Sequence, residues 1–458
     1  MVEQIMQDAA GKAIPAGYQQ TEVGVIPHEW NVRKLKEISP SQSVGLVINP
    51  SSYYSSNGSI PMLVGSHVSE NKIFWSNANK ITEESNAKLP ASRLNAGDLV
   101  TVRVGAPGIT AVVPIELDKA NCASMMIIRK SDCFDSQWLC YLMNSKHGKA
   151  CIEGVQYGTA QKQFNIIDAV EFLFPVPPKQ EQTAIANVLS DSDALIGSLE
   201  QLIAKKQAIK SATMQQLLTG RTRLPQFALR PDGTPKGYKT SELGHIPEDW
   251  HEVSLSSVTK NIDAGVSVNS IDQLDAYGHG KHVLKTSCVN GGVFNCLEAK
   301  SIIPSDTGRA KCFPCEGNII VSRMNTPALV GEIGYIEKSL PGYFLPDRLW
   351  QVSFREDAEL NTKWLMYVLA HPINSKKIKE SATGTSNSMK NISKNAFLAL
   401  NFYKPNIEEQ TAIATILSDM DSELNALKQK LAKARDLKQG MMQQLLTGRI
   451  RLPVEQVE

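Results

Sequence analysis

The chain carries the same series of sequence blocks twice, and this repeat constrains its fold more than any other feature. The blocks read [TS]-E-[VL]-G-x-I-P-x-[ED]-W, then E-Q-T-A-I-A-x-x-L-S-D, then M-Q-Q-L-L-T-G-R. The matching pairs are 21–30 with 241–250, 181–191 with 409–419, and 214–221 with 442–449. A repeat of this length and order indicates a tandem duplication, so the fold must contain two similar halves.

The repeats divide the 458 residues into segments that differ in how closely the two copies match. We predict an opening segment (1–30), a first globular domain (31–178), a central long helix (179–220), a linker with the second opening motif (221–250), a second globular domain (251–405) and a C-terminal long helix (406–458). The two globular segments match only sparsely, whereas the blocks around them are nearly identical. This contrast predicts one globular fold that carries two different surfaces.

The two near-identical stretches are predicted to be long helices. Residues 180–218 and 408–446 contain no proline and one glycine each, and apolar residues recur at steps of three and four. The predicted seam consists of Ile185, Leu189, Leu195, Leu199, Leu202, Ile209, Met214 and Leu217 in the first helix, and Ile413, Leu417, Met420, Leu424, Leu427, Leu431, Ala434, Leu437, Met441 and Leu445 in the second. We expect the helices to pair with each other as an antiparallel coiled coil between the two domains. A helical hairpin that only dimerises the protein is the alternative.

The globular segments have the pattern of mixed α and β structure. Residues 98–104 and 318–323 favour strands, and residues rich in Gly, Pro, Asn and Ser interrupt the segments at short intervals. Short helices are expected around 138–144 and 363–369. The predicted class is α+β, with two tandem α/β domains and mostly antiparallel sheets.

Composition places the chain among ordinary globular proteins and limits its chemistry. The net charge is +2, so nucleic-acid binding would need local basic patches or a partner. No run of 18 apolar residues and no signal-peptide pattern occurs, which predicts a cytoplasmic protein with reduced cysteines. Cys312 and Cys315, with Cys288 and Cys296 upstream, suit zinc only poorly, because Cys288 and Cys296 are too widely spaced to form a second close pair of zinc ligands.

Catalytic motifs do not stand out. The string nearest to a methyltransferase motif, 49–53 (N-P-S-S-Y), lacks a second proline. Residues 278–282 (G-H-G-K-H) fail as a phosphate loop because no Ser or Thr follows the lysine. No acid, base or nucleophile is evident at matching positions of both domains, so we expect catalysis to belong to partner subunits.

The repeated blocks and the duplicated layout resemble the specificity subunits of Type I restriction-modification systems, over essentially the whole chain. This resemblance implies two target-recognition domains that read double-stranded DNA, separated by helices that dock two methyltransferase subunits. It also implies restriction/translocase subunits as further partners, no membrane association, and no cofactor on this chain. S-adenosylmethionine, ATP and Mg²⁺ would bind the partner subunits. A coiled-coil scaffold or a fragment of a fused restriction enzyme is the alternative.

Two polar, glycine-containing loops are the strongest candidates for DNA contact, because Gln, Asn, Ser and Thr read base edges and Lys neutralises phosphates. The predicted residues are Tyr157, Gly158, Thr159, Gln161 and Lys162 in the first domain, and Gly384, Thr385, Ser386, Asn387, Ser388 and Lys390 in the second. Arg103 and Arg323 end matching strands and either contact DNA or form internal ion pairs. Arg348, beside Asp347, is expected to be structural. The weaker candidates are Tyr53, Tyr54, His67, Lys285 and Ser287.

Overall fold

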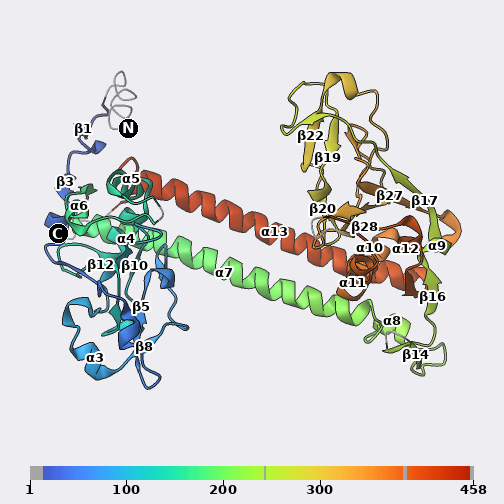
Figure 1. Cartoon of the computed structure of the whole chain (residues 1–458), viewed down its shortest axis with the longest axis horizontal. Helices are drawn as coiled ribbons and strands as arrows, with labels where there is room; N and C mark the ends of the chain where they lie inside the picture. Colours follow the sequence, from blue (N-terminus) through green and yellow to red (C-terminus); the bar gives the residue numbers. More distant parts are fainter. Residues whose placement is uncertain (1–13, 160, 242–243, 385–388, 454–458) are drawn as a thin grey trace. The chain divides into compact units, whose positions relative to one another are not determined.

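The computed structural model of the chain describes residues 14–159, 161–241, 244–384 and 389–453. It divides into two compact units, residues 1–201 with 429–458 (unit 1) and residues 202–428 (unit 2). The division crosses both long helices, α7 (Lys179–Leu217) and α13 (Ile407–Leu445). Each unit therefore contains one half of each long helix (Figure 1).

The two long helices pair with each other within both units. In unit 1, Asp193 forms an ion pair with Lys438, and Glu200 forms one with Arg435. Partner numbers fall along α13 as they rise along α7, which shows that the helices are antiparallel. The pairs in unit 2 have the same order, Lys206 with Glu423 and Lys210 with Asp421. The predicted antiparallel pairing is confirmed. Both helices have 39 residues and end at Leu217 and Leu445, within the longer predicted segments 179–220 and 406–458.

The predicted seam is wrong at four positions. The exposed side chains are Leu195 (54%), Leu202 (38%), Ile209 (41%) and Leu437 (61%). The seam includes Lys210 and Lys438 instead, whose side chains are only 12% and 14% exposed. The prediction chose the aliphatic neighbour of each lysine, because the sequence pattern counts only apolar residues as seam positions.

Unit 1 is built around a four-stranded antiparallel sheet. Its order is β10 (Thr110–Val112), β9 (Leu99–Val102), β12 (Met125–Ile128) and β4 (Gln42–Val44). Alternate residues of a strand point to opposite faces. Leu99 and Met126 therefore pack with Trp138 of helix α4, whereas Val100 and Ile127 join a second apolar cluster. Both faces are covered, so all eight residues of β9 and β12 are buried.

Smaller elements complete unit 1. The strands form the sheets β11 (Asn121–Cys122)–β5 (Ile60–Leu63)–β8 (Lys80–Ile81), β6 (Val68–Ser69)–β7 (Lys72–Ile73), β1 (Tyr18–Thr21)–β2 (Gly24–Pro27) and β3 (Asn31–Lys34)–β13 (Leu173–Val176). The helices are α2 (Leu35–Ile38), α3 (Glu83–Ala87), α4 (Ser136–Asn144), α5 (Lys146–Val155) and α6 (Ile166–Ala169). Pairing of β11 with β5 is parallel, and the other strand pairs in these sheets are antiparallel.

Unit 2 repeats this plan. Its central sheet has the order β17 (Thr259–Ala264), β27 (Leu349–Phe354), β23 (Ile319–Ser322) and β25 (Ile333–Tyr335). The other sheets are β18 (Ser270–Ile271)–β22 (Ala299–Ile302)–β19 (His282–Leu284)–β26 (Tyr343–Phe344), β20 (Val289–Asn290)–β21 (Val293–Phe294), β24 (Met324–Asn325)–β28 (Lys390–Asn391), β14 (Tyr238–Ser241)–β15 (Gly244–Pro247) and β16 (His251–Ser254)–β29 (Asn401–Lys404). The helices besides the long ones are α8 (Pro225–Ala228), α9 (Leu255–Val258), α10 (Thr362–Ala370), α11 (Pro372–Glu380) and α12 (Lys394–Leu398).

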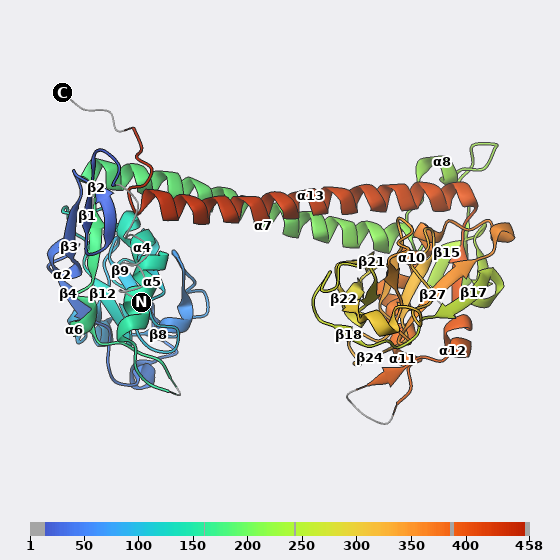
Figure 2. The ribbon, with the colours of Figure 1, turned by 90° about the horizontal axis from the view of Figure 1, so that it is seen from above.

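The predicted α+β class is confirmed, and the two units share one frame. Strands β9 and β23, which the sequence aligns at an offset of 220 residues, occupy equivalent places in the two central sheets. The short helices predicted around 138–144 and 363–369 are α4 and α10 (Figure 2). Within the described ranges, none of the helices is long and apolar enough to span a membrane.

Candidate nucleic-acid interface

In unit 1 the loop 157–162 and the end of β9 with Arg103, which were both predicted to contact DNA, lie side by side. The backbones of Tyr157 and Gln163 exchange hydrogen bonds of 2.8 and 2.9 Å, which closes the loop between them. Gly105 donates a 3.0 Å hydrogen bond to the carbonyl of Lys162, so the segment after β9 lies against this loop. The predicted residues Tyr157, Gly158, Thr159, Gln161 and Lys162 are all exposed. The half-buried Arg103 lies next to this loop, since its carbonyl accepts a hydrogen bond from Phe164, and these residues together are named here loop site 1.

Unit 2 brings the matching segments together with its own pairing. Thr383 and Asn391 exchange two hydrogen bonds of 2.9 Å, and strands β24 and β28 pair next to them. Lys390 is half-buried, and its ammonium donates a 2.9 Å hydrogen bond to the carbonyl of Gly384. Arg323, Gly384 and Lys390 form loop site 2. Four predicted residues, Thr385, Ser386, Asn387 and Ser388, lie outside the described residues.

The two strand-end arginines are held differently. Arg103 Nε donates a 3.3 Å hydrogen bond to the carbonyl of Phe164. Arg323 Nε donates to the carbonyl of Asp347 at 2.7 Å, and its guanidinium lies 5.8 Å from the ring centroid of Trp350. Neither arginine pairs with a carboxylate among the described residues. Of the two predicted roles, an internal ion pair therefore lacks support, and Arg103 has the less restrained guanidinium.

Both loop sites depend on a glycine with positive φ. Gly158 has φ +96°, and a Cβ there would lie 2.3 Å from the carbonyl oxygen of Gln161. Gly384 has φ +149°, and a Cβ there would lie 2.8 Å from the carbonyl oxygen of Met389. Such approaches exclude a side chain. The glycines, which were predicted as DNA-contacting residues, are thus required by the conformation of the loops themselves.

The weaker candidates are mostly engaged inside the protein. His67 is buried, burial lowers its pKa, and its Nδ1 accepts a 3.0 Å hydrogen bond from the backbone of Val64. Lys285 pairs with Asp272 at 2.6 Å, and Ser287 donates to Glu298 at 2.7 Å. The half-buried Tyr53 and Tyr54 pack on an apolar cluster. Arg348 is exposed, and its side chain has no partner among the described residues. The structural role predicted for it is therefore not supported by a contact.

A junction that sequence reasoning missed closes unit 1. Glu181, at the start of α7, is 1% exposed and accepts a 3.0 Å hydrogen bond from the indole of Trp30. Arg451, which follows α13, donates to Glu181 at 2.5 Å and to Glu29 at 2.8 Å. The first and last described segments of the chain are thereby joined.

The same junction occurs in unit 2 with residues from the middle of the chain. Arg223, which follows α7, donates to Glu409 at 2.6 and 2.7 Å and to Asp249 at 2.8 Å. Trp250 donates to Glu409 at 3.3 Å. The tryptophan and the carboxylates belong to repeated blocks, and Arg223 and Arg451 each lie two residues after one, at matching positions. The repetition was therefore the available signal, although it did not show which residues meet.

The repeated E-Q-T motif also attaches the globular domains to the long helices. Gln182 Oε1 accepts a 2.9 Å hydrogen bond from the backbone of Asp135, the N-cap of α4, and Thr183 donates to its carboxylate at 3.1 Å. Gln410 Oε1 accepts the corresponding 2.9 Å bond from Asn361, the N-cap of α10. Each residue of the motif therefore fixes a different contact, which explains why the block is repeated closely.

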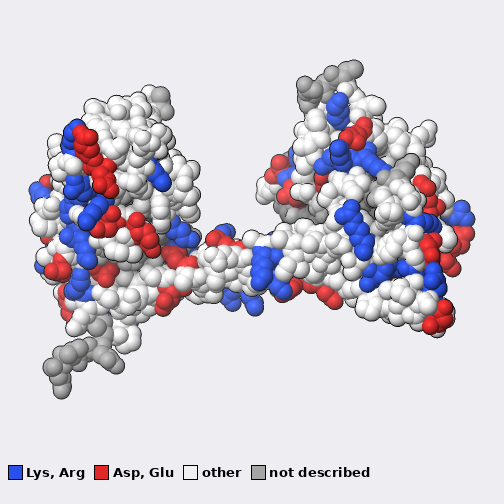
Figure 3. Space-filling model, turned by 90° about the horizontal axis from the view of Figure 1, so that it is seen from below, with Lys and Arg blue, Asp and Glu red and all other residues white. Residues whose placement is uncertain are grey.

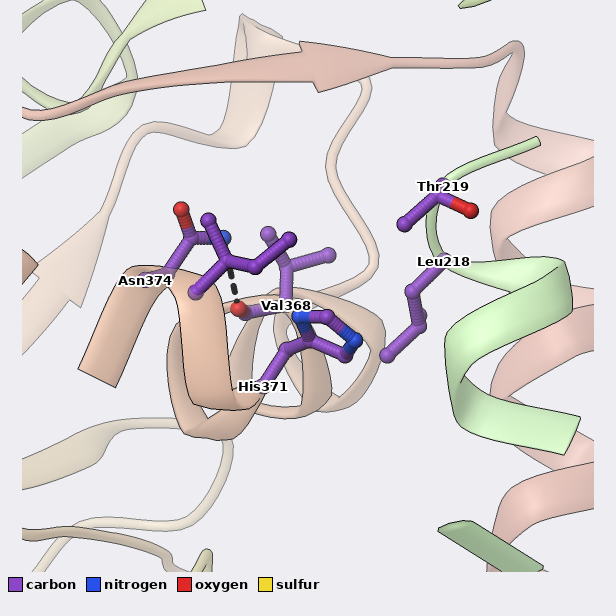
Figure 4. A pocket seen from close by; sticks show the side chains of 6 residues that line it. Leu218, Thr219, Val368, His371 and Asn374 are labelled. Carbon is purple, nitrogen blue, oxygen red and sulfur yellow. Dashed lines mark hydrogen bonds between the residues drawn. The ribbon is translucent and has the colours of Figure 1, made fainter. Parts of the chain in front are cut away.

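A small cavity in unit 2 lies where α10 and α11 meet the end of α7 (Figure 4). Its lining residues are Leu218, Thr219, Val368, His371, Ile373 and Asn374. The volume of about 20 Å³ admits roughly one water molecule, far below the several hundred Å³ typical of small-molecule sites. His371 Nε2 lies 3.0 Å from Gln215 Oε1, and burial lowers the pKa of this histidine. The cavity is a packing feature and not a substrate pocket.

The cysteines weighed as zinc ligands, and judged to suit zinc poorly, have no metal-binding arrangement in the described part of the chain. Cys288 and Cys312 are free thiols, and burial raises their pKa values to about 12 and about 11. Over the ranges that the structure describes, no group of three or more His, Cys, Asp and Glu residues is placed to hold an ion.

Charge is distributed without a large basic field on the face drawn in Figure 3. Within each unit, Lys and Arg alternate with Asp and Glu, in agreement with 48 basic and 46 acidic residues overall. Contacts to phosphate from this face would therefore come from individual side chains.

Comparisons with known proteins agree with the duplicated plan. The family model for the Type I restriction modification DNA specificity domain matches residues 27–210 and again 247–434. The Type I restriction enzyme MjaVIII specificity subunit of Methanocaldococcus jannaschii is 25% identical over 81% of the chain and 80% of that protein. The putative MjaX specificity subunit of the same organism is 23% identical over 95% and 97%. The crystal structure of a Type I system S subunit from M. genitalium has a TM-score of 0.57 at 15% identity, covering 91% and 96%.

Proposed function

Because the chain belongs to the Type I restriction-modification DNA specificity family, we propose that loop site 1 and loop site 2 read the two halves of one split DNA target. The chain is a specificity subunit with two recognition domains, so a pure scaffold is not favoured. The observation that carries the proposal is one frame bearing two unlike loops. Unlike loops read unlike sequences, so the target is asymmetric, with unread base pairs between its halves.

Loop site 1 has the groups needed for both kinds of DNA contact. Thr159 and Gln161 are exposed donors and acceptors for base edges, and Lys162 is an exposed cation for phosphate. Arg103 lies beside them, and among the described residues its side chain makes a single hydrogen bond, to the backbone, so its remaining donors can turn to a guanine edge. In loop site 2, Arg323 is held in place, which leaves Lys390 and the four residues 385–388 as the readers.

The near-identical blocks give each unit an equivalent surface. Two equivalent surfaces suit two copies of the same partner, and we assign them to two methyltransferase subunits. S-adenosylmethionine would bind these partners, and restriction/translocase subunits would bring ATP and Mg²⁺. This assignment places all catalysis outside the chain.

Base-resolution methylation sequencing tests the proposal. A methylation-free bacterial host would express the chain with its methyltransferase subunit, with the host lacking the chain as control. The expected result is one asymmetric split motif with a fixed gap, absent in the control. A continuous motif, or methylation that persists without the chain, would contradict the proposal.

The double variant Arg103→Ala/Lys162→Ala shows which half of the DNA target is read by unit 1. It should weaken methylation by relaxing or removing one half-site while the other half-site keeps its sequence. Arg355→Ala is the matched control, because this exposed arginine forms an ion pair with Asp357. Loss of sequence selectivity in both halves at once would contradict a separate reader in each unit.

A further inference from the structure

A tyrosine, an aspartate and a lysine meet in unit 1 from three different helices. Tyr141 of α4 donates a 2.8 Å hydrogen bond to Asp193 Oδ2 of α7. Lys438 of α13 forms an ion pair with Asp193 Oδ1 at 2.6 Å, and its ammonium lies 5.3 Å from the ring centroid of Tyr141. Each residue thus contacts both others, and the recognition domain is tied to both long helices at one point.

Unit 2 contains the same three residues with the two long helices exchanged. Tyr367 of α10 donates a 2.7 Å hydrogen bond to Asp421 Oδ2 of α13. Lys210 of α7 pairs with Asp421 Oδ1, and its ammonium lies 5.5 Å from the ring centroid of Tyr367. The triad is therefore retained in both copies, although the globular segments that carry the tyrosines match only sparsely.

The lysines occupy positions that packing alone would give to aliphatic residues. Their side chains are 12% and 14% exposed, whereas the adjacent Ile209 and Leu437 are 41% and 61% exposed. A polar residue in a coiled-coil seam lowers stability but selects one register. A largely buried ion pair likewise adds little stability over apolar packing, because both charges lose their hydration. A contribution to folding stability therefore does not explain why the triads are present in both units.

We propose that the two triads are positioning sites that hold each recognition domain in one orientation on the long helices. They thereby fix the number of unread base pairs between the two half-sites of the DNA target. The inference rests on the proposed function. A leucine contact tolerates sliding, whereas a hydrogen bond and an ion pair to one carboxylate weaken steeply when their geometry changes. Without the triad, a domain can turn on the helices and engage a half-site one base pair nearer or farther.

The variants Tyr141→Phe and Tyr367→Phe remove one hydroxyl each and keep the buried ring. Expressed singly and together with the methyltransferase subunit, they should leave both half-site sequences unchanged. Methylation of targets with a gap one base pair longer or shorter should rise about tenfold relative to the chain without substitutions, the change expected for one lost hydrogen bond to a charged group. Lys438→Arg, which keeps the cation and its stacking, should retain the single gap.

The matched control is Arg435→Met. Arg435 pairs with Glu200 between the same two helices but is 57% exposed and touches no recognition domain in its ion pair. It should keep one gap. Thermal unfolding and gap selectivity would be measured on the same purified complexes, with a series of DNA duplexes that differ only in gap length.

A single unchanged gap in the Tyr141→Phe/Tyr367→Phe double variant would overturn the inference. Equal loss of methylation at every gap would also overturn it, since the triads would then serve stability alone. A chain without substitutions that produces no split motif would refute the proposed function instead, so the two failures are distinguishable.

Discussion

In unit 1 the arginine of the junction comes from the last described segment of the chain, and its side chain is 34% exposed. In unit 2 the equivalent Arg223 comes from the middle of the chain and is 5% exposed. Both face a glutamate whose side chain is 2% exposed. The same contact therefore occurs twice in one protein, once with a partly exposed arginine and once with a buried one. The two copies should respond differently to the same substitution.

The largest difference is expected from removing the two arginines. Arg223→Met leaves the buried carboxylate of Glu409 without its cation and should cost about 3–5 kcal/mol in the unfolding free energy of unit 2. Arg451→Met should cost about 1–3 kcal/mol in unit 1, because Arg451 is partly exposed and water can take its place beside Glu181. Hydrogen exchange of β14–β16 and of β1–β3 would measure the two effects separately.

Arg355→Met is the control for this pair, since its ion pair with Asp357 is exposed on both sides. It should leave the unfolding free energy essentially unchanged. Equal costs for Arg223→Met and Arg451→Met would show that burial of the arginine does not set the strength of the junction.

The loop glycines provide the next comparison. Gly158→Ala forces a Cβ to 2.3 Å from a backbone oxygen and should open loop site 1 at a cost of about 1–3 kcal/mol. Gly384→Ala meets a backbone oxygen at 2.8 Å and should cost less. Methylation of each half-site would be measured along with stability. Gly154→Ala in helix α5, where nothing lies within 4 Å of the added Cβ, should be neutral or stabilising. A loss with Gly154→Ala as large as with Gly158→Ala would contradict the steric explanation.

The strand-end arginines should separate function from stability. Arg323→Ala removes the hydrogen bond to Asp347 and the contact with Trp350, and should destabilise unit 2 by about 1–2 kcal/mol. Arg103→Ala loses one hydrogen bond and should act mainly on methylation at its half-site. Chemical denaturation and methylation rates of the two variants would test this. The opposite order of effects would assign DNA contact to Arg323.

The smallest effect concerns pH. The N-cap of α5 is Ser145, whose hydroxyl accepts a hydrogen bond from Gly148, whereas the N-cap of α11 is the buried His371. Burial, and then the charge of Arg221, lowers the pKa of His371 below its ordinary 6.5. The unfolded chain therefore takes up this proton first, and the unfolding free energy of unit 2 decreases as the pH falls below 6.5.

His371→Gln should remove part of that decrease while keeping a partner for Gln215. Denaturation of unit 2 at pH 7.5 and at pH 5.5 would measure the change, which we expect to be below about 1 kcal/mol. An identical pH dependence in the variant would assign the titration to another group of unit 2.

Much of the architecture could be predicted from the sequence. The repeats predicted two similar halves, the absence of proline predicted both long helices, and β-favouring runs predicted the strands β9 and β23. These features depend on local propensity and periodicity, which a single segment carries by itself. The resemblance drawn from the same blocks agrees with the family to which the chain belongs. The loop sites were found as segments, and their contact with DNA stays a prediction.

The remaining features required the tertiary structure. The apolar pattern does not give which side of α7 and α13 faces inward. Lys210 and Lys438 lie in the seam, where they pair with Asp421 and Asp193, while Ile209 and Leu437 are exposed. The partners of Glu181 and Glu409 likewise lie far from these glutamates along the chain. A hydrogen bond or ion pair depends on two groups meeting in space, and no local pattern records which distant group will arrive. Local propensity and the repeated blocks thus specify the elements and their duplication, whereas the polar contacts that join these elements form only in the tertiary fold.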